Sequence, residues 1–207
     1  MAPDYDDEAE SSHPLHEVFR KNSRPWQGFW WWRDRAVMER NAVRTVLMGA
    51  GIEVSELRSR TDDPPDCEAM IDGRRCGIEV TELLHRPALE RSIRAVRARE
   101  EGREPDPNAR EAYFTWERED VLEALQGLID RKDQAETKGG PYSRYILVIV
   151  TDEFVLDQHT VAQFLDGATF NATYITDVLF GLSYHPSSEP GGGSYPVFTL
   201  HCVSREA

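Results

Sequence analysis

The stretch that decides the fold is residues 65–83, PDCEAMIDGRRCGIEVTEL. It predicts a β-hairpin, because Asp72 and Gly73 tolerate the positive φ that a tight two-residue turn requires. A turn at this point fixes which residues of the two strands lie opposite each other. The predicted pairs are Ile71–Arg74, Met70–Arg75, Ala69–Cys76, Glu68–Gly77, Cys67–Ile78 and Asp66–Glu79.

The last of these pairs brings two carboxylates together. Directly opposed side chains share one face of a sheet, with Cβ atoms about 5 Å apart. Asp66 and Glu79 would therefore repel each other unless a cation lies between them or one of them holds a proton. Hard divalent cations prefer oxygen ligands. The hairpin thus predicts a site for Mg²⁺ or Mn²⁺.

Composition indicates a single α/β unit. The chain has 207 residues, of which 40% are hydrophobic, enough for one core of ordinary size. Residues 1–25 are acidic and aperiodic, and we expect a disordered tail there, followed by one domain over 26–207. The aromatic cluster WQGFWWW at 26–32 is predicted to be a buried brace before the first helix, with a stacking platform for bases as the alternative.

Charge and cysteine usage limit the function classes. The net charge is −13, and residues 1–25 contribute only −3 of it, so the body is acidic and unsuited to gripping nucleic acid over its whole surface. A local basic groove stays open as a possibility. No apolar run approaches the roughly 18 residues of a membrane span, and no export signal is visible, so we expect no membrane partner. Three cysteines without a CxxC pair favour reduced thiols and a cytoplasmic location.

Hydrophobic periodicity predicts alternating helices and strands around the hairpin, that is, an α/β fold with a mixed central sheet flanked by helices. The continuous apolar run YILVIVT at 145–151 is typical of a strand buried on both faces. The glycine-rich segment 185–194 is expected to be a flexible connection. The expected helices are 33–50, one opened by Pro87, 115–135 and 158–170, and the further strands are 52–59, 145–151, 177–184 and 195–203.

Glu39 is an unusual residue on the first predicted helix, because it lies at the centre of the apolar face. A buried carboxylate is costly unless it is paired or binds something. Two interpretations stay open, an ion pair with Arg35 or another arginine, and a ligand role beside the hairpin.

The helix opened by Pro87 carries the most basic stretch of the chain. Its inner face is predicted to contain Leu89, Ile93 and Val96. Its arginines either form a solvated face or contact nucleic-acid phosphates. The candidates for nucleic-acid binding are Arg86, Arg91 and Arg94.

The order of elements over about residues 33–151, with Pro65-Asp66 before the second hairpin strand and Glu79-Val80-Thr81 on it, resembles the PD-(D/E)XK nuclease superfamily. That resemblance implies a restriction-endonuclease-like fold. It also implies that Asp66 and Glu79 bind Mg²⁺ or Mn²⁺, helped by the carbonyl of Val80. Glu39 is similar to the additional acidic residue that many members carry on their first helix.

The chain departs from this family at Thr81, which occupies the position of the motif lysine. Threonine supplies no positive charge and is a poor general base. Lys132, at the end of the 115–135 helix, and Arg86 are the candidate replacements. The alternative for Lys132 is an ordinary charge near a helix C-terminus, where cations are favoured. Catalytic roles are therefore assigned to Glu39, Asp66, Glu79, Thr81 and Lys132.

Three functions follow as expectations. The first is a metal-dependent nuclease acting on DNA or RNA. The second is a catalytically inactive protein that keeps the nuclease fold as a binding or scaffold module, which the acidic body and Thr81 favour. The third is an unrelated α/β domain in which Asp66 and Glu79 are ordinary exposed hairpin residues. His85 is only a weak candidate for lining the site.

Overall fold

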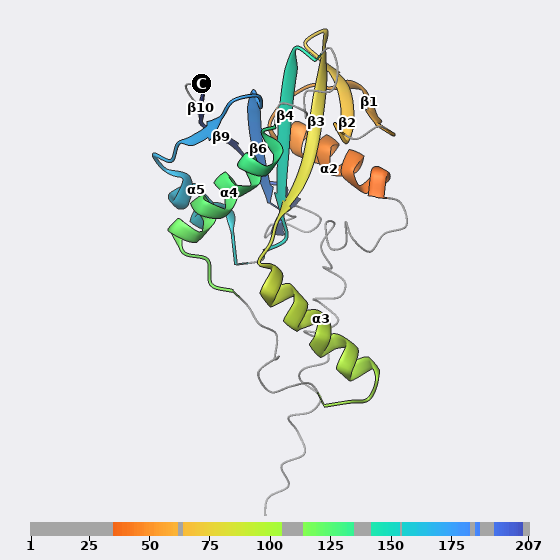
Figure 1. The fold of residues 1–207 in the computed structure, drawn as a ribbon, viewed down its shortest axis with the longest axis vertical. Helices are drawn as coiled ribbons and strands as arrows, with labels where there is room; N and C mark the ends of the chain where they lie inside the picture. The colour runs from red at the N-terminus through yellow and green to blue at the C-terminus, as the bar shows by residue number, and fades with distance from the viewer. Residues whose placement is uncertain are drawn as a thin grey trace, which may run out of the picture.

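The computed structural model describes residues 35–61, 64–104, 114–134, 142–153, 155–182, 185–186 and 193–204. The predicted acidic tail over 1–25 and the aromatic cluster over 26–32 lie outside these residues. In the described part, the chain forms a mixed α/β structure built on a six-stranded sheet (Figure 1). The described helices are, in chain order, α2 (Arg35–Gly49), α3 (Arg86–Glu100), α4 (Arg118–Lys132) and α5 (Gln158–Leu165).

The sheet order is β1-β2-β3-β4-β6-β9, so the hairpin strands lie between the edge strand β1 and the centre. The pairs β3–β4 and β4–β6 are parallel, and the other pairs are antiparallel. The mixed sheet predicted from the sequence is therefore confirmed. Its strands are β1 (Ser55–Ser59), β2 (Cys67–Ile71), β3 (Arg74–Leu83), β4 (Arg144–Thr151), β6 (Asp177–Leu182) and β9 (Val197–Leu200).

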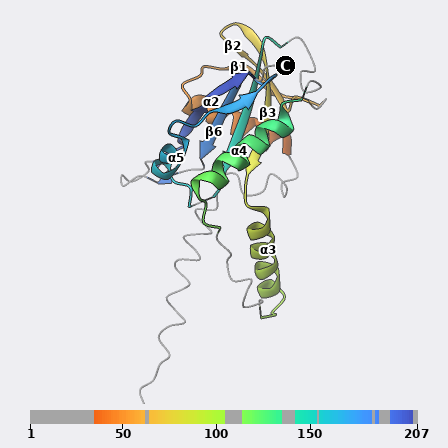
Figure 2. The same ribbon diagram turned by 60° about the vertical axis from the view of Figure 1, so that its left-hand side comes forward.

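Alternating side chains of β4 separate the core into two layers. Tyr145, Leu147 and Ile149 belong to the cluster that packs with α4 and α5, whereas Ile146 and Val148 belong to the cluster beneath α2. Successive residues of a strand point to opposite faces, and all of β4 after Arg144 is buried. The prediction that this apolar run is a strand buried on both faces is confirmed. Helices cover both faces of the sheet (Figures 1 and 2).

The first helix lies close against the sheet. A Cβ built on Gly181 of β6 would meet Val46 Cγ2 at 2.6 Å, so only glycine allows this approach. The buried residues of α2 are Glu39, Ala42, Val43, Val46 and Leu47. Glu39 therefore lies on the buried face, as its position in the sequence predicted, whereas Ala36 is exposed and not part of that face.

The two helices after the hairpin are placed differently. α3 begins at Arg86 and extends away from the sheet beyond the end of β3 (Figures 1 and 2). Leu89 is 43% exposed, so its predicted place on an inner face is wrong; the side chains of Ile93 and Val96 lie outside the described set. α4 packs on the sheet and buries Val121, Leu125, Leu128 and Ile129.

The C-terminal part of the chain contains more short strands than the sequence indicated. The predicted helix 158–170 ends at Leu165, and Phe170–Ala172 form β5. The predicted strand 195–203 is divided into β9 and β10 (Cys202–Ser204), and β10 pairs in parallel with β5 outside the main sheet. Within the segment 185–194, β7 (His185–Pro186) pairs with β8 (Gly193–Ser194). In the described residues, no helix combines the length and apolar character that a membrane crossing needs.

Candidate metal-binding and catalytic site

The hairpin has the predicted turn and register. Asp72 and Gly73 have φ values of 51° and 70°, and the five ladder pairs from Ile71–Arg74 to Cys67–Ile78 are formed. The sixth predicted pair, Asp66–Glu79, is not part of the ladder, because β2 begins at Cys67. Instead, the side chain of Asp66 accepts a hydrogen bond of 2.8 Å from the backbone N–H of Val80. Asp66 is therefore still held beside the strand that carries Glu79.

Glu79 lies in the most enclosed position of the site. It is fully buried, and its two oxygens have different donors: Lys132 Nζ lies 2.5 Å from Oε2, and the hydroxyl of Tyr145 donates to Oε1 at 3.1 Å. Burial and the negative charge of Asp66 raise the pKa of Glu79, while the contacts with Lys132 and Tyr145 lower it; the net direction is upward. The surroundings of Glu79 therefore favour its protonated form more than water does.

Glu39 is connected to Asp66 through an arginine. Arg35 Nε lies 2.5 Å from Glu39 Oε1, and Arg35 Nη2 lies 3.8 Å from Asp66 Oδ1. The ion pair with Arg35, one of the two interpretations left open by the sequence, is therefore formed. The second interpretation, a ligand role for Glu39, stays a prediction.

Among the described residues, Arg35 contacts the carboxylates of Glu39 and Asp66, and Lys132 contacts that of Glu79. Asp66 and Glu79 are 7% and 0% exposed. The expectation that they are ordinary exposed hairpin residues is therefore wrong. Burial and the neighbouring Asp66 raise the pKa of Glu79, and a divalent cation would relieve the repulsion between the two carboxylates.

Two carboxylates, Asp66 and Glu79, and the carbonyl of Val80 are oxygen donors of the kind that a hard cation prefers. Since the N–H and C=O of one strand residue point to the same side, the bond from Val80 N to Asp66 directs the Val80 carbonyl toward the side where Asp66 lies. Within the described residues, however, no group of three or more His, Cys, Asp or Glu side chains is arranged to hold a metal ion.

Of the other predicted site residues, some lie near Glu79 and others lie on α3, away from it. Lys132, the last residue of α4, reaches Glu79, and Thr81 lies on the same face of β3 two residues beyond Glu79. Arg86 and Arg94 are exposed residues of α3, and Arg94 Nε donates to the carbonyl of Glu90. Of the two candidate replacements for the motif lysine, Lys132 is the one that contacts Glu79, and its catalytic role stays a prediction. Arg91 also lies on α3, with its Nε buried.

His85 has a structural position. Its ring stacks on Phe114 with centroids 3.8 Å apart, and its Nδ1 accepts a hydrogen bond of 3.2 Å from the N–H of Ala88 at the start of α3. The contact with Ala88 satisfies one of the amides that a helix N-terminus leaves without a partner.

The position of Lys132 depends on the residue after it. The carboxylate of Asp133 accepts hydrogen bonds from three consecutive backbone amides, those of Thr173 at 2.5 Å, Tyr174 at 2.6 Å and Ile175 at 2.8 Å. These bonds tie the end of α4 to the loop between β5 and β6. No local sequence pattern indicates this contact, because it joins residues that are 40 or more positions apart.

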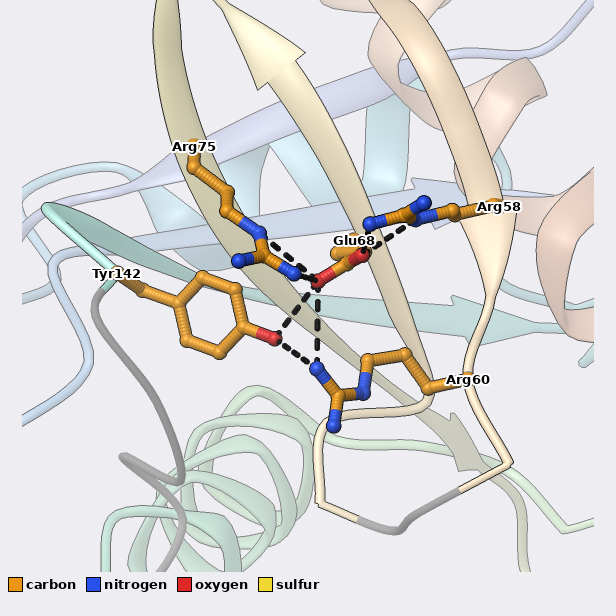
Figure 3. A network of polar contacts seen from close by, with 5 residues as sticks. All are labelled: Arg58, Arg60, Glu68, Arg75 and Tyr142. Carbon is orange, nitrogen blue, oxygen red and sulfur yellow. Dashed lines mark hydrogen bonds and ion pairs between the residues drawn. The ribbon is translucent and has the colours of Figure 1, made fainter.

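A second buried carboxylate, which sequence reasoning did not single out, lies on the same face of the hairpin. Glu68 is 4% exposed and is surrounded by Arg58, Arg60, Arg75 and Tyr142 (Figure 3). Arg58 contacts Oε1. Arg60 at 3.3 Å, Arg75 Nη2 at 2.6 Å and the hydroxyl of Tyr142 at 2.9 Å contact Oε2. Burial raises the pKa of Glu68, but these hydrogen bonds outweigh it and lower the pKa to about 2.

Gly77 lies between the two carboxylates. It pairs with Glu68 across the ladder and precedes Glu79 by two residues. A Cβ built on Gly77 would meet Tyr145 Cε2 at 2.8 Å and Tyr142 Cδ2 at 2.9 Å. The absence of a side chain at this position allows both tyrosine rings to lie on β3, where one donates to Glu79 and the other to Glu68.

Comparisons of the chain with protein-family models, with curated proteins and with solved structures gave no match.

Proposed function

We propose that this protein is a metal-dependent, nuclease-like hydrolase of nucleic-acid phosphodiester bonds, with a restriction-endonuclease-like arrangement of its sheet and a cytoplasmic location. The observation that carries the proposal is the contact between Lys132 Nζ and Glu79 Oε2 beside the buried Asp66. This contact brings a lysine to the pair formed by Asp66 and Glu79, since β3 has Thr81 at the position where the family motif has lysine. The family resemblance, read from residues 65–81, supports the same conclusion.

The residues present fit a hard divalent cation, since Asp66 and Glu79 offer carboxylate oxygens and Val80 a carbonyl on the side of Asp66. When bound, such a cation would lower the pKa of a water molecule and stabilise negative charge on the phosphoryl group. Asp66 and Glu79 would hold it, and Glu39 would act through Arg35, which contacts both Glu39 and Asp66.

Lys132 and Tyr145 would have distinct roles around Glu79. The Tyr145 hydroxyl fixes the orientation of the carboxylate through Oε1. The Lys132 side chain is 30% exposed, whereas that of Glu79 is 1% exposed, so the ammonium group forms the boundary between the acid pair and solvent. From there it can donate a hydrogen bond to the attacking water or to a phosphate oxygen. Thr81, on the same face, would contribute at most a hydroxyl.

The experiment is a cleavage assay on DNA and RNA with Mg²⁺ or Mn²⁺. Asp66→Asn and Lys132→Met are each expected to lower the metal-dependent rate by about 100-fold, the scale of losing one group that positions or transfers a proton. Arg131→Met is the matched control, because Arg131 is the exposed neighbour of Lys132 in the last turn of α4. Equal rates for Asp66→Asn and the wild type would contradict the proposal.

A second variant tests the role assigned to Lys132. Thr81 shares the face of Glu79, so Thr81→Lys in the Lys132→Met background would return an ammonium group to the side of the acid pair. We expect partial recovery of the rate. A double variant no faster than Lys132→Met would contradict the idea that Lys132 replaces a lysine on the strand.

The second candidate function is a non-catalytic binding or scaffold module with the same fold. The observation that favours it is that protein donors already contact both oxygens of Glu79. Under this alternative, Mg²⁺ produces no cleavage in any variant, and the Lys132→Met and Asp66→Asn substitutions change only stability.

A further inference from the structure

We propose that Arg58, Arg60 and Arg75 form a contact site for the phosphate backbone of a nucleic-acid strand, assembled in advance on the buried carboxylate of Glu68. This inference deepens the proposed function and rests on it, because it names the part of the substrate that is held beside the acid pair. The site differs from the α3 arginines that the sequence pointed to, since it lies on the sheet (Figure 3).

The first argument is the local charge. Three guanidinium groups surround a single carboxylate, so the cluster has a formal excess of two positive charges. One arginine would be enough to compensate a buried glutamate, and the whole chain has a net charge of −13. Like charges held this close repel each other, so a further anion at the exposed edges of Arg58 and Arg75 would be bound favourably.

The second argument is the accessibility of the cations relative to their anchor. The side chain of Glu68 is 5% exposed, whereas those of Arg58 and Arg75 are 66% and 41% exposed, and that of Arg60 is 24% exposed. The buried carboxylate therefore contacts the guanidinium groups on their inner side, and their outer edges stay at the surface. A guanidinium has more N–H donors than one carboxylate can accept, and its planar fork matches phosphate oxygens.

The third argument is position. Glu68 and Asp66 are two residues apart on the same chain segment, about 6.6 Å along a strand, and the backbone N–H of Arg60 donates to the carbonyl of Asp66 at 2.9 Å. Tyr142 contacts the arginine cluster, and its ring lies 6.2 Å from that of Tyr145, whose hydroxyl donates to Glu79. A strand whose phosphates contact these arginines therefore passes beside the acid pair.

The fourth argument concerns the cover of the sheet. Arg58 pairs with Glu68 across β1 and β2, and α4 packs against β3 and β5. Among the described residues, Arg58, Arg60, Arg75 and Tyr142 contact Glu68 on this side of β1 and β2. Several arginines held close together suit a polyanion, because each can neutralise one phosphate.

The experiment measures binding without cleavage. A fluorescein-labelled single-stranded DNA oligonucleotide of mixed sequence, and its RNA counterpart, are titrated with the full chain in EDTA, and fluorescence anisotropy is followed at several salt concentrations. Arg58→Gln and Arg75→Gln are each expected to weaken binding at least fivefold, and each to reduce the slope of log K against log salt by about 0.7, the value for one lost contact to a single-stranded phosphate.

The matched control is Arg74→Gln. Arg74 is the exposed neighbour of Arg75 at the start of β3 and points to the opposite face of the sheet. The substitution Arg74→Gln therefore removes the same charge from the same hairpin without removing an arginine from Glu68. Equal weakening by Arg74→Gln and Arg75→Gln would overturn the proposal, because binding would then depend on net charge alone. Thermal unfolding of each variant shows whether it is folded, and the single substitutions leave two arginines on Glu68.

Failure of this inference is distinguishable from failure of the proposed function. Normal binding by both arginine variants together with loss of cleavage in Asp66→Asn overturns the arginine site and retains the nuclease. Weakened binding without metal-dependent cleavage by the wild type retains the arginine site and removes the nuclease. A cluster that binds poly-glutamate but not the oligonucleotides also overturns the proposal, since its partner would then be an acidic protein.

Discussion

Glu68 and Glu79 are two buried carboxylates on one face of one hairpin, yet their surroundings have opposite effects. Three arginines and a tyrosine hold the pKa of Glu68 at about 2, whereas burial and the nearby Asp66 raise the pKa of Glu79 despite Lys132 and Tyr145. Both residues are buried, at 4% and 0% exposed. At Glu68 the hydrogen bonds from Tyr142 and the three arginines outweigh the effect of burial on the pKa, whereas at Glu79 burial and Asp66 outweigh the two donors.

This difference separates a stabilising arrangement from one suited to function. A buried carboxylate with several hydrogen-bonded cations favours the folded state. A buried carboxylate next to another carboxylate costs stability, and such strain is typical of sites that bind or react. The hairpin thus carries a stabilising carboxylate, Glu68, two residues from Asp66, which forms the destabilising pair with Glu79.

The largest effect is expected for Glu68→Gln. Removing the charge leaves three arginines close together with no anion between them, and breaking a buried ion pair costs about 3 kcal/mol. Urea-induced unfolding measures the change in free energy. Glu123→Gln, on the exposed face of α4, is the control and should change stability by less than about 0.5 kcal/mol. Similar values for the two variants would mean that the arginine cluster contributes little.

The second prediction concerns acid pH. The folded-state pKa of Glu68 lies below its ordinary value of about 4.3, so its contribution to stability is complete above that value and is lost as the pH falls toward about 2. We expect the difference in unfolding free energy between the wild type and Glu68→Gln to shrink over this interval. A difference independent of pH would show that the effect of the substitution is steric.

Glu79→Gln is expected to have the opposite sign. The pKa of Glu79 is raised in the folded state, so its contribution is favourable only at low pH and is lost as the pH rises through the folded-state pKa. At neutral pH the substitution should stabilise the protein by about 1 kcal/mol, because it removes the repulsion with Asp66 while Lys132 keeps access to solvent. A loss of stability as large as that of Glu68→Gln would contradict the raised pKa of Glu79.

The smallest effects are expected for the two tyrosines. Tyr145→Phe leaves Glu79 with one donor fewer and should cost about 1 kcal/mol. Tyr142→Phe should cost less than this, because three arginines still contact Glu68. Thermal unfolding of each single variant and of the doubles with Glu79→Gln and Glu68→Gln yields the coupling energies. Equal coupling energies for Tyr145 with Glu79 and for Tyr142 with Glu68 would contradict the proposed difference between the two carboxylates.

Local sequence rules predicted the hairpin well. The Asp72-Gly73 turn and the alternation of side chains fixed the register from Ile71–Arg74 to Cys67–Ile78, because both depend only on neighbouring residues. The buried strand β4 was equally clear. The start of β2 was not predicted correctly. Asp66 contacts Val80 through its side chain and does not continue the ladder, and this depends on where the chain enters the hairpin.

The partners of the carboxylates were only partly accessible to sequence reasoning. Lys132 was a candidate because lysine is rare in the chain, but its contact with Glu79 spans 53 positions. Glu68 was already placed on the face of Glu79 by the register. Nothing local indicated that Arg58, Arg60 and Tyr142 would converge on it, because the pairing of β1 and the entry into β4 are properties of the tertiary fold.

The anchor formed by Asp133 has a consequence for dynamics. Its three bonds to the amides of residues 173–175 join the last turn of α4 to the loop before β6, so the two segments open together or not at all. In hydrogen exchange, these amides should therefore be protected to the same degree as the end of α4. Lys132 precedes the anchor directly, and the lifetime of its contact with Glu79 is then governed by a cooperative opening and not by side-chain rotation alone.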